Sequence, residues 1–263
     1  MNSFDLQQVP TEFSILKWWP YYSKALFILA KTYDPENSVT GNVKMEPIEA
    51  QQKMFNFIHC LFSMLPDSTA RLYAMDFLMM KDYVGQNLVN RLPKFFYVYS
   101  IYHDQILFHS NQFFNYCLRS SSSLFNWVYL FQAFMFMKLK DNGIQVEIPT
   151  INQLRDEYHV DKLTITDWGN NLWYILHTTS LYAHDPIDQA FMNYRCMLES
   201  LQYLLPCPKC RVHLQQNLQK INLTTCAQTR FQLFKCSWQL HNIVNKDTGK
   251  ELVSFEHAMS LYI

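Results

Sequence analysis

Residues 204–214 read LLPCPKCRVHL, and the CPKC inside this stretch governs how the rest of the chain is interpreted. Cys207 and Cys210 are spaced so that, on the first turn of a helix, they can close a disulfide across the turn. The positive end of the helix dipole also stabilises a thiolate there. Pro208 suits this turn, because the N–H that proline lacks would have no partner in the helix. The spacing therefore predicts a redox-active dithiol.

Zinc binding is the main alternative for CPKC. A closed structural zinc site needs four Cys or His ligands, and only His213 lies close in sequence, with no second CxxC or HxxxH pair. Cys226 and Cys236 fall ten residues apart on what is expected to be one helix, where they would face different ways. A thioredoxin-like site would need a β-strand before the motif, whereas residues 191–205 have helical periodicity. A zinc-stabilised protein-interaction module stays open as the alternative function, although no metal site is predicted.

The composition indicates an all-α protein. Only 5 of the 263 residues are glycine, while 20 are Phe and 16 are Tyr. Scarce glycine means few tight turns and bulges. A formal net charge of zero argues against a nucleic-acid-binding surface. Seven cysteines with a single CxxC fit an intracellular chain better than a secreted disulfide scaffold.

No targeting or membrane segment is expected. Residues 1–14 lack both a basic region and an apolar core, so they do not resemble a signal peptide. The most apolar stretch, 124–139, is too short to span a bilayer and predicts a core or interface helix.

Apolar residues recur with helical spacing along both halves of the chain. The predicted helices cover 14–30, 48–65, 68–80, 95–114, 124–139, 168–183, 188–205, 207–219 and 225–244. RSSSS at 119–123 is expected to be a connector, and Thr224 or Thr225 to cap the last helix. The clearest break is 140–150, with Asn142-Gly143 and Pro149. We therefore predict two domains, 1–150 and 151–263.

A weak internal repeat links the two halves. When Pro66 is aligned with Pro206, LFSMLPDSTARLYAMDFL lies over LQYLLPCPKCRVHLQQNL with five identities. The helix before each segment also pairs, since Ile15 and Trp18 fall over Ile165 and Trp168. Downstream, the tract around Tyr102-His103 falls about as far from DSTA as Leu240-His241 does from CPKC. The pattern fits a degenerate duplication and fits chance pairing of Leu-rich helices equally well, so both interpretations stay open at this point.

Two further stretches flank CPKC. In WGNNLWYILHTTSLY, residues 168–182, Trp173 and His177 fall on one helix face. In HNIVNKDTGK, residues 241–250, His241, Asn242 and Asn245 precede a glycine. Taken alone, each stretch has a structural explanation: aromatic packing for Trp173 and His177, and a helix C-cap for the segment that ends at Gly249. Their combination with CPKC, in this order, resembles the Erv/ALR family of FAD-linked sulfhydryl oxidases. The resemblance covers about residues 160–255.

The resemblance implies a four-helix bundle that binds FAD. It assigns flavin and adenine contacts to Trp173, His177 and Tyr182, with Gly169 permitting close approach. It assigns adenosine contacts to His241, Asn242 and Asn245, and the ribose–pyrophosphate side to Lys246 and Lys250. Cys207 would react with substrate, and Cys210 would lie nearer the flavin. The implied activity is disulfide formation in protein dithiols, with O₂ as acceptor and H₂O₂ as product.

The chain departs from the family in three places. Ala183-His184 stands where a Tyr-Pro is frequent, no cysteine follows Cys236, and a second, shuttle CxxC is missing from the sequence. Substrate dithiols are therefore expected to reach Cys207 directly.

The repeat is then interpreted as a pseudo-dimer of such bundles within one chain, as in baculovirus-type members. In the N-terminal copy, Asp67-Ser68-Thr69-Ala70 replaces CPKC, and Ser23 and Phe27 replace Trp173 and His177. The resemblance, together with the single-chain pseudo-dimer and the aromatic, glycine-poor composition, implies a viral, insect-virus-like member. It also implies action in the host cytoplasm or nucleus and in the virion, and it allows a homodimer of such chains. Cys60, Cys117 and Cys196 are expected to be buried free thiols and are assigned no role. The histidines expected to be structural are His59, His103 and His109.

Overall fold

The structure is a computed structural model of the 263-residue chain that describes residues 14–40, 43–79, 110–158, 163–184 and 186–263. Its regular elements are almost all helical, so the all-α prediction is confirmed. The helices are α1 (Ile15–Thr32), α2 (Pro47–Ser63), α3 (Ser68–Leu78), α6 (Ser110–Cys117), α7 (Ser121–Asp141), α8 (Ile151–Glu157), α9 (Ile165–Leu181), α10 (Ile187–Leu204), α11 (Pro208–Leu218), the 3₁₀ helix η4 (Leu223–Ala227), α12 (Arg230–Asp247) and α13 (Phe255–Ser260). Two short strands, β1 (Val39–Thr40) and β2 (Val43–Lys44), form an antiparallel hairpin.

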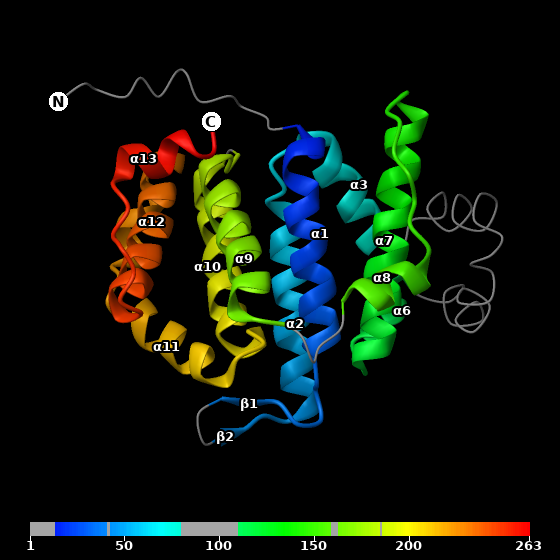
Figure 1. The fold of residues 1–263 in the computed structure, drawn as a ribbon, viewed down its shortest axis with the longest axis horizontal. Helices are drawn as coiled ribbons and strands as arrows, with labels where there is room; N and C mark the ends of the chain where they lie inside the picture. Colours follow the sequence, from blue (N-terminus) through cyan, green and yellow to red (C-terminus); the bar gives the residue numbers. More distant parts are fainter. Residues whose placement is uncertain (1–13, 41–42, 80–109, 159–162, 185) are drawn as a thin grey trace.

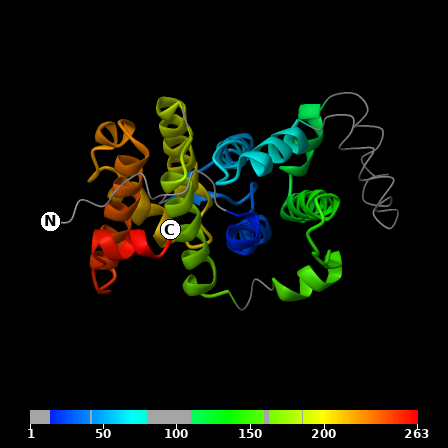
Figure 2. The same cartoon turned by 90° about the horizontal axis from the view of Figure 1, so that it is seen from above.

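The two halves of the chain lie side by side (Figure 1). Helix α1 packs against α7 on one side and against α9 on the other, and α2 packs against α10. Figure 2 shows α1 and α2 between the α7 side and the α9, α10 and α12 side of the molecule. Helices from both halves therefore share one interface at the centre of the fold.

Aromatic side chains make this interface specific. The Tyr22 hydroxyl is fully buried and lies 2.8 Å from Thr178 Oγ1. The rings of Tyr21 and Tyr174 stack with centroids 3.8 Å apart. Because a buried hydroxyl needs a partner, the Tyr22–Thr178 bond fixes the register of α1 on α9.

The predicted helices match most of the observed ones, with corrections at some ends. The RSSSS connector is wrong in part, because Ser120 accepts from the Ser123 amide and caps α7, which begins at Ser121. The helix predicted over 225–244 begins instead at Arg230, where Thr229 is the cap, and η4 precedes it. Most of the helix predicted over 95–114 lies outside the described residues, as does Tyr102-His103.

The two halves repeat the same turn before a helix. In the N-terminal half the Asp67 side chain accepts from the Ala70 amide, and Arg71 Nη1 donates to the Leu65 carbonyl at 2.6 Å. In the C-terminal half Cys207 Sγ accepts from the Cys210 amide, and Arg211 Nε donates to the Leu205 carbonyl at 2.7 Å. These bonds join positions that the sequence alignment already pairs.

A second matched turn ends α7 and α12. Gly143 and Gly249 have positive φ angles of 78° and 70°, a conformation that favours glycine. In both turns the amide that follows the glycine donates to a carbonyl in the last turn of the helix. The Ile144 amide donates to the Leu139 carbonyl at 2.9 Å, and the Lys250 amide donates to the Asn245 carbonyl at 2.8 Å. The two turns share this geometry, and the tract around residues 102–103, which the sequence spacing paired with Leu240-His241, lies outside the described residues.

Candidate redox site

Cys207 and Cys210 occupy the start of α11, as predicted. Cys207 is the N-cap residue, its Sγ accepts from the Cys210 amide at 3.3 Å, and Pro208 is the first helical residue. The two cysteines form a disulfide with their Cα atoms 5.2 Å apart. Both side chains are partly exposed, so the pair is accessible to a reacting thiol.

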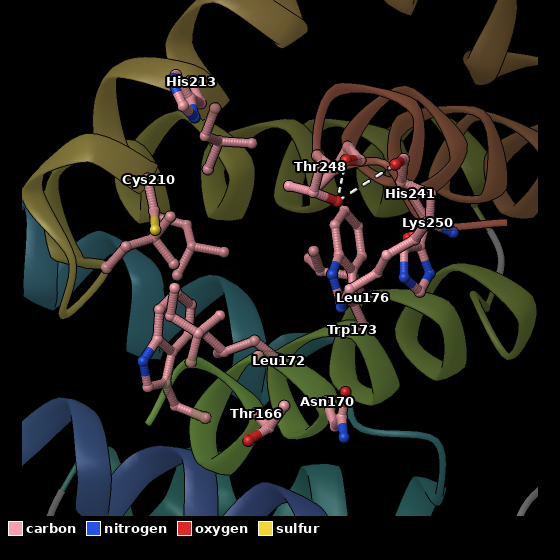
Figure 3. Close-up of a pocket in the computed structure, with 18 residues that line it drawn as sticks. Thr166, Asn170, Leu172, Trp173, Leu176, Cys210, His213, His241, Thr248 and Lys250 are labelled. Atoms are coloured by element: carbon pink, nitrogen blue, oxygen red, sulfur yellow. Dashed lines mark hydrogen bonds between the residues drawn. The ribbon is translucent and has the colours of Figure 1, made fainter. Parts of the chain in front are cut away.

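A cavity of about 180 Å³ lies beside this disulfide, between α9, α10, α11 and α12. Its walls are mostly apolar, and Cys210 is part of them whereas Cys207 is not. Figure 3 shows Cys210 at one side of the cavity and Trp173, His241 and Lys250 at the other. The two cysteines therefore have different surroundings, one next to the cavity and the other outside it.

The far wall of the cavity is a stack of aromatic rings. Trp173 and His241 are nearly parallel, with centroids 4.0 Å apart and an interplanar angle of 7°. Behind them, His177 Nε2 lies 2.9 Å from His241 Nδ1, and its Nδ1 lies 2.9 Å from Ser237 Oγ. Each ring nitrogen of His177 thus has a partner, which fixes the orientation of His177 and, through it, that of His241.

Burial keeps both histidines neutral. It lowers the pKa of His177 to about 3, with the neighbouring His241 adding to the effect. It lowers the pKa of His241 to about 4, and the positive charge of Lys250 acts in the same direction. Neutral imidazoles carry one donor and one acceptor nitrogen each, as a Ser237–His177–His241 chain of hydrogen bonds requires.

The two histidines are expected to make the fold sensitive to mild acid. In the unfolded chain His titrates near pH 6.5, so below that pH the unfolded state takes up protons that the folded state does not. Stability is therefore full above about pH 6.5 and falls as the pH drops towards 4. We expect urea midpoints measured at pH 7.5 and 5.0 to differ less in His177→Gln than in the wild type. His257→Gln, at an exposed position, should leave the difference unchanged, and an equal change in both variants would contradict the assignment.

Polar groups suited to a bound ligand lie at the cavity. Asn245 is buried and lines it, and its side-chain amide has no hydrogen-bond partner among the described residues. Lys250 is exposed at the rim and forms no ion pair within the described part of the chain. An apolar slot with a parallel aromatic wall, a free amide and a cation fits a planar ring system joined to an anionic chain, as in FAD.

The structure separates the predicted contact residues into groups. Gly169, Trp173, His241, Asn245, Lys250 and Cys210 line the cavity. His177 lies one step behind it, bonded to His241. Three others lie elsewhere: the Tyr182 hydroxyl donates to the Tyr262 carbonyl, Asn242 bonds the Val253 backbone, and Lys246 borders a separate hollow.

Sequence reasoning missed several residues of the cavity. Trp168, Asn170, Leu172 and Leu176 line it from α9, and His213 and Leu214 line it from α11. The signal was available, because Trp168, Leu172 and Leu176 share the helical spacing that placed Trp173 on this face.

A second disulfide corrects the expectation for Cys226 and Cys236. They do not share a helix, since Cys226 lies in η4 and Cys236 in α12, and they form a disulfide with Cα atoms 6.0 Å apart. Both are buried. A disulfide that closes so short a loop stabilises a fold by about 2 to 4 kcal/mol, so the link holds η4 on the helix that carries His241.

The zinc alternative lacks a ligand set in the described part of the chain, where no three or more His, Cys, Asp and Glu side chains lie together as a metal site would require. None of the described helices combines the length and apolar character needed to cross a membrane.

The fold and site define a helical bundle in which a cysteine pair at the start of a helix borders an aromatic pocket. The sequence model of the Erv1/Alr family matches residues 170–262, and through this region the chain belongs to that family. The match includes both disulfides and the Trp173–His241 stack.

Named relatives are viral proteins, as predicted. A probable FAD-linked sulfhydryl oxidase of Acanthamoeba polyphaga mimivirus is 33% identical over 94 residues, 35% of this chain and 66% of its own length. An FAD-linked sulfhydryl oxidase of African swine fever virus is 29% identical over 101 residues, 36% of this chain and 79% of its own. A putative FAD-linked sulfhydryl oxidase of Invertebrate iridescent virus 3 is 28% identical over 96 residues, 36% of this chain and 65% of its own. The chain thus spans about two thirds of the mimivirus relative. No solved structure matches it.

Proposed function

We propose that this chain is an FAD-dependent thiol oxidase that forms disulfide bonds in protein substrates. One observation carries the proposal: Cys210 of the Cys207–Cys210 disulfide lines the same cavity as the Trp173–His241 stack. The chemistry that bound FAD would supply is acceptance of two electrons from the reduced cysteine pair and their transfer to O₂, giving H₂O₂. The family match and the names of the viral relatives support the same interpretation.

The different surroundings of the two cysteines assign their roles. A substrate thiolate attacks Cys207 Sγ, which lies outside the cavity, and the Cys207–Cys210 bond breaks to release the Cys210 thiolate. The second substrate thiol, as thiolate, attacks the substrate sulfur of this mixed disulfide, forms the substrate disulfide and releases the Cys207 thiolate. The Cys210 amide, which donates to Cys207 Sγ in the structure, stabilises this leaving thiolate at the helix N-terminus.

The cavity residues have separate tasks in this proposal. Trp173 and His241 bind the planar part of the cofactor, and Asn245 supplies a hydrogen bond. Lys250 pairs with the anionic chain. His177 and Ser237 keep the His241 ring oriented. Tyr182 and Asn242 have no contact with this cavity, and their hydrogen bonds to the Tyr262 and Val253 backbone lead us to assign them to the packing of the bundle. Lys246 is exposed and borders a separate hollow, and we assign it no role.

We further propose that the N-terminal half is a degenerate copy of the C-terminal half. The two matched turns and the pairing of α1 with α9 and α2 with α10 support this interpretation. At the position of Gly169, which lines the cavity, the N-terminal half has Trp19, which is buried against Phe131 and Phe136. The copy therefore keeps the fold and a hollow of about 190 Å³ beside its Asp67 turn, but it lacks the cysteine pair and has Ser23 at the position of Trp173. Protein dithiols as substrates, action in the host cytoplasm or nucleus and in the virion, and a homodimer of such chains remain predictions.

The visible spectrum of the purified protein tests the function. We expect flavin absorption bands, release of FAD on denaturation, and O₂ consumption with H₂O₂ formation when dithiothreitol is added. Elemental analysis run on the same sample tests the zinc alternative. Colourless protein that contains one zinc ion per chain and loses its fold with a chelator would overturn the proposal.

A further inference from the structure

Helix α11, which carries the cysteine pair, is held weakly by its own packing. It has 11 residues, and only Leu214 and Asn217 are buried. Both lie in its second half, and at the end that carries Cys207 the two cysteines are only partly buried against the core. Elements with few buried contacts open readily, and a reactive turn of this kind needs some other restraint.

Arg211 provides that restraint, one residue after Cys210. Its Nε donates to the Leu205 carbonyl at 2.7 Å, and its Nη1 donates to the Val39 carbonyl at 2.9 Å. Leu205 lies two residues before Cys207, whereas Val39 lies in β1 of the N-terminal half. The guanidinium, with several N–H donors in a rigid fork, can bond two carbonyls at once.

The hairpin that supplies Val39 is itself anchored. Strand β1 pairs with β2, the Met45 amide donates to the Ser38 carbonyl at 2.9 Å, and α2 begins at Pro47, directly after this hairpin. Helix α2 packs along α10, the helix that leads into the cysteine turn. The Arg211 bond to Val39 thus closes a ring of contacts that runs through α11, the hairpin, α2 and α10 (Figure 1).

We propose that Arg211 is a positioning residue through which the N-terminal half holds the redox-active turn, so that Cys210 stays at the cavity and Cys207 stays outside it. This gives the half without a cysteine pair a part in the reaction. The effect of Arg211 on turnover rests on the proposed oxidase activity, whereas the restraint of the cysteine turn by Arg211 does not depend on that activity. Burial lowers the pKa of Arg211, and the side chain remains a cation.

Amide hydrogen exchange on the purified full chain tests the restraint. We expect Arg211→Gln to speed exchange in a peptide covering residues 207–216 by about ten-fold or more, since the opening of the turn is no longer opposed. Arg211→Lys should restore little of the protection, because all donors of an ammonium lie on one nitrogen and do not reproduce the spacing of Nε and Nη1 in the guanidinium. Arg71→Gln is the matched control: Arg71 makes the corresponding bond to Leu65, so its loss should affect the N-terminal turn and leave 207–216 unchanged.

Turnover with dithiothreitol gives the second readout. In Arg211→Gln we expect kcat to fall about ten-fold, since a displaced reacting group reacts slowly, with KM and flavin content unchanged. Arg71→Gln should keep wild-type kcat. Unchanged exchange in Arg211→Gln, or full rescue by Arg211→Lys, would overturn the restraint. A wild type without oxidase activity would overturn the proposed function alone, because the exchange result does not depend on it.

Discussion

Cys207→Ser and Cys210→Ser are each expected to lower dithiol oxidation by at least about a thousand-fold, since loss of a reacting group removes the pathway and not just a contact. Both variants should keep their flavin. Serine is a good N-cap, so in Cys207→Ser the new hydroxyl would accept from the amide of residue 210 and preserve the start of α11. The measurement is O₂ consumption with dithiothreitol, together with the visible spectrum of each variant.

The two variants should differ in how the remaining thiol reacts. In Cys210→Ser, the thiol of Cys207 lies outside the cavity and should form a mixed disulfide with glutathione disulfide. In Cys207→Ser, the thiol of Cys210 faces the cavity and should react at least several-fold more slowly. Cys196→Ser removes another partly exposed cysteine and should retain full activity. Equal thiol reactivity in the two variants would contradict the roles assigned to Cys207 and Cys210.

Helix periodicity was sufficient to predict most of the bundle. Helices α2 and α10 bury residues at helical spacing, which is the pattern that periodicity detects, and α1 and α9 show it in their first halves before they become buried on all sides. The Thr225–Val244 prediction failed at its start for a different reason. The backbone breaks at η4, where the Cys226–Cys236 disulfide crosses between two elements, and local spacing carries no information on such a crossing.

The motifs predicted the region of the candidate site but did not distinguish the residues that line the cavity from those that lie behind them. Trp173 and His177 look equivalent in WGNNLWYILH, yet one lines the cavity and the other lies behind His241. The difference depends on Ser237, which is 60 residues from His177 in the chain. Asn242 and Asn245 also look equivalent in HNIVNKDTGK, and both are predicted to contact adenosine. The side-chain amide of Asn242 instead bonds the Val253 backbone, outside the motif. Whether each of these side chains lines the cavity thus depends on hydrogen bonds to residues outside its own motif.

Gly169→Trp is expected to abolish flavin binding without unfolding the protein. In the duplication proposed above, Trp19 falls at the corresponding position of α1, where it is buried among aromatic rings, so we expect the fold to accept an indole at this point of the helix. An indole at residue 169 would take up the space beside Trp173 that we assign to the cofactor. We expect FAD affinity to fall at least about 100-fold, about 2.8 kcal/mol, measured as flavin retained after gel filtration, with the helical circular dichroism signal preserved.

Gly169→Ala separates filling of the cavity from effects on the helix backbone. A Cβ at residue 169 would meet only Ile165 Cγ2, at 3.7 Å, an ordinary contact. Alanine in place of glycine inside a helix stabilises it by up to about 1 kcal/mol, so this variant should be as stable as the wild type or more so, and should stay yellow. Retention of full flavin by Gly169→Trp would place the cofactor elsewhere. Loss of flavin in both variants would instead mean that the cofactor approaches the α9 backbone so closely that even a methyl group is excluded.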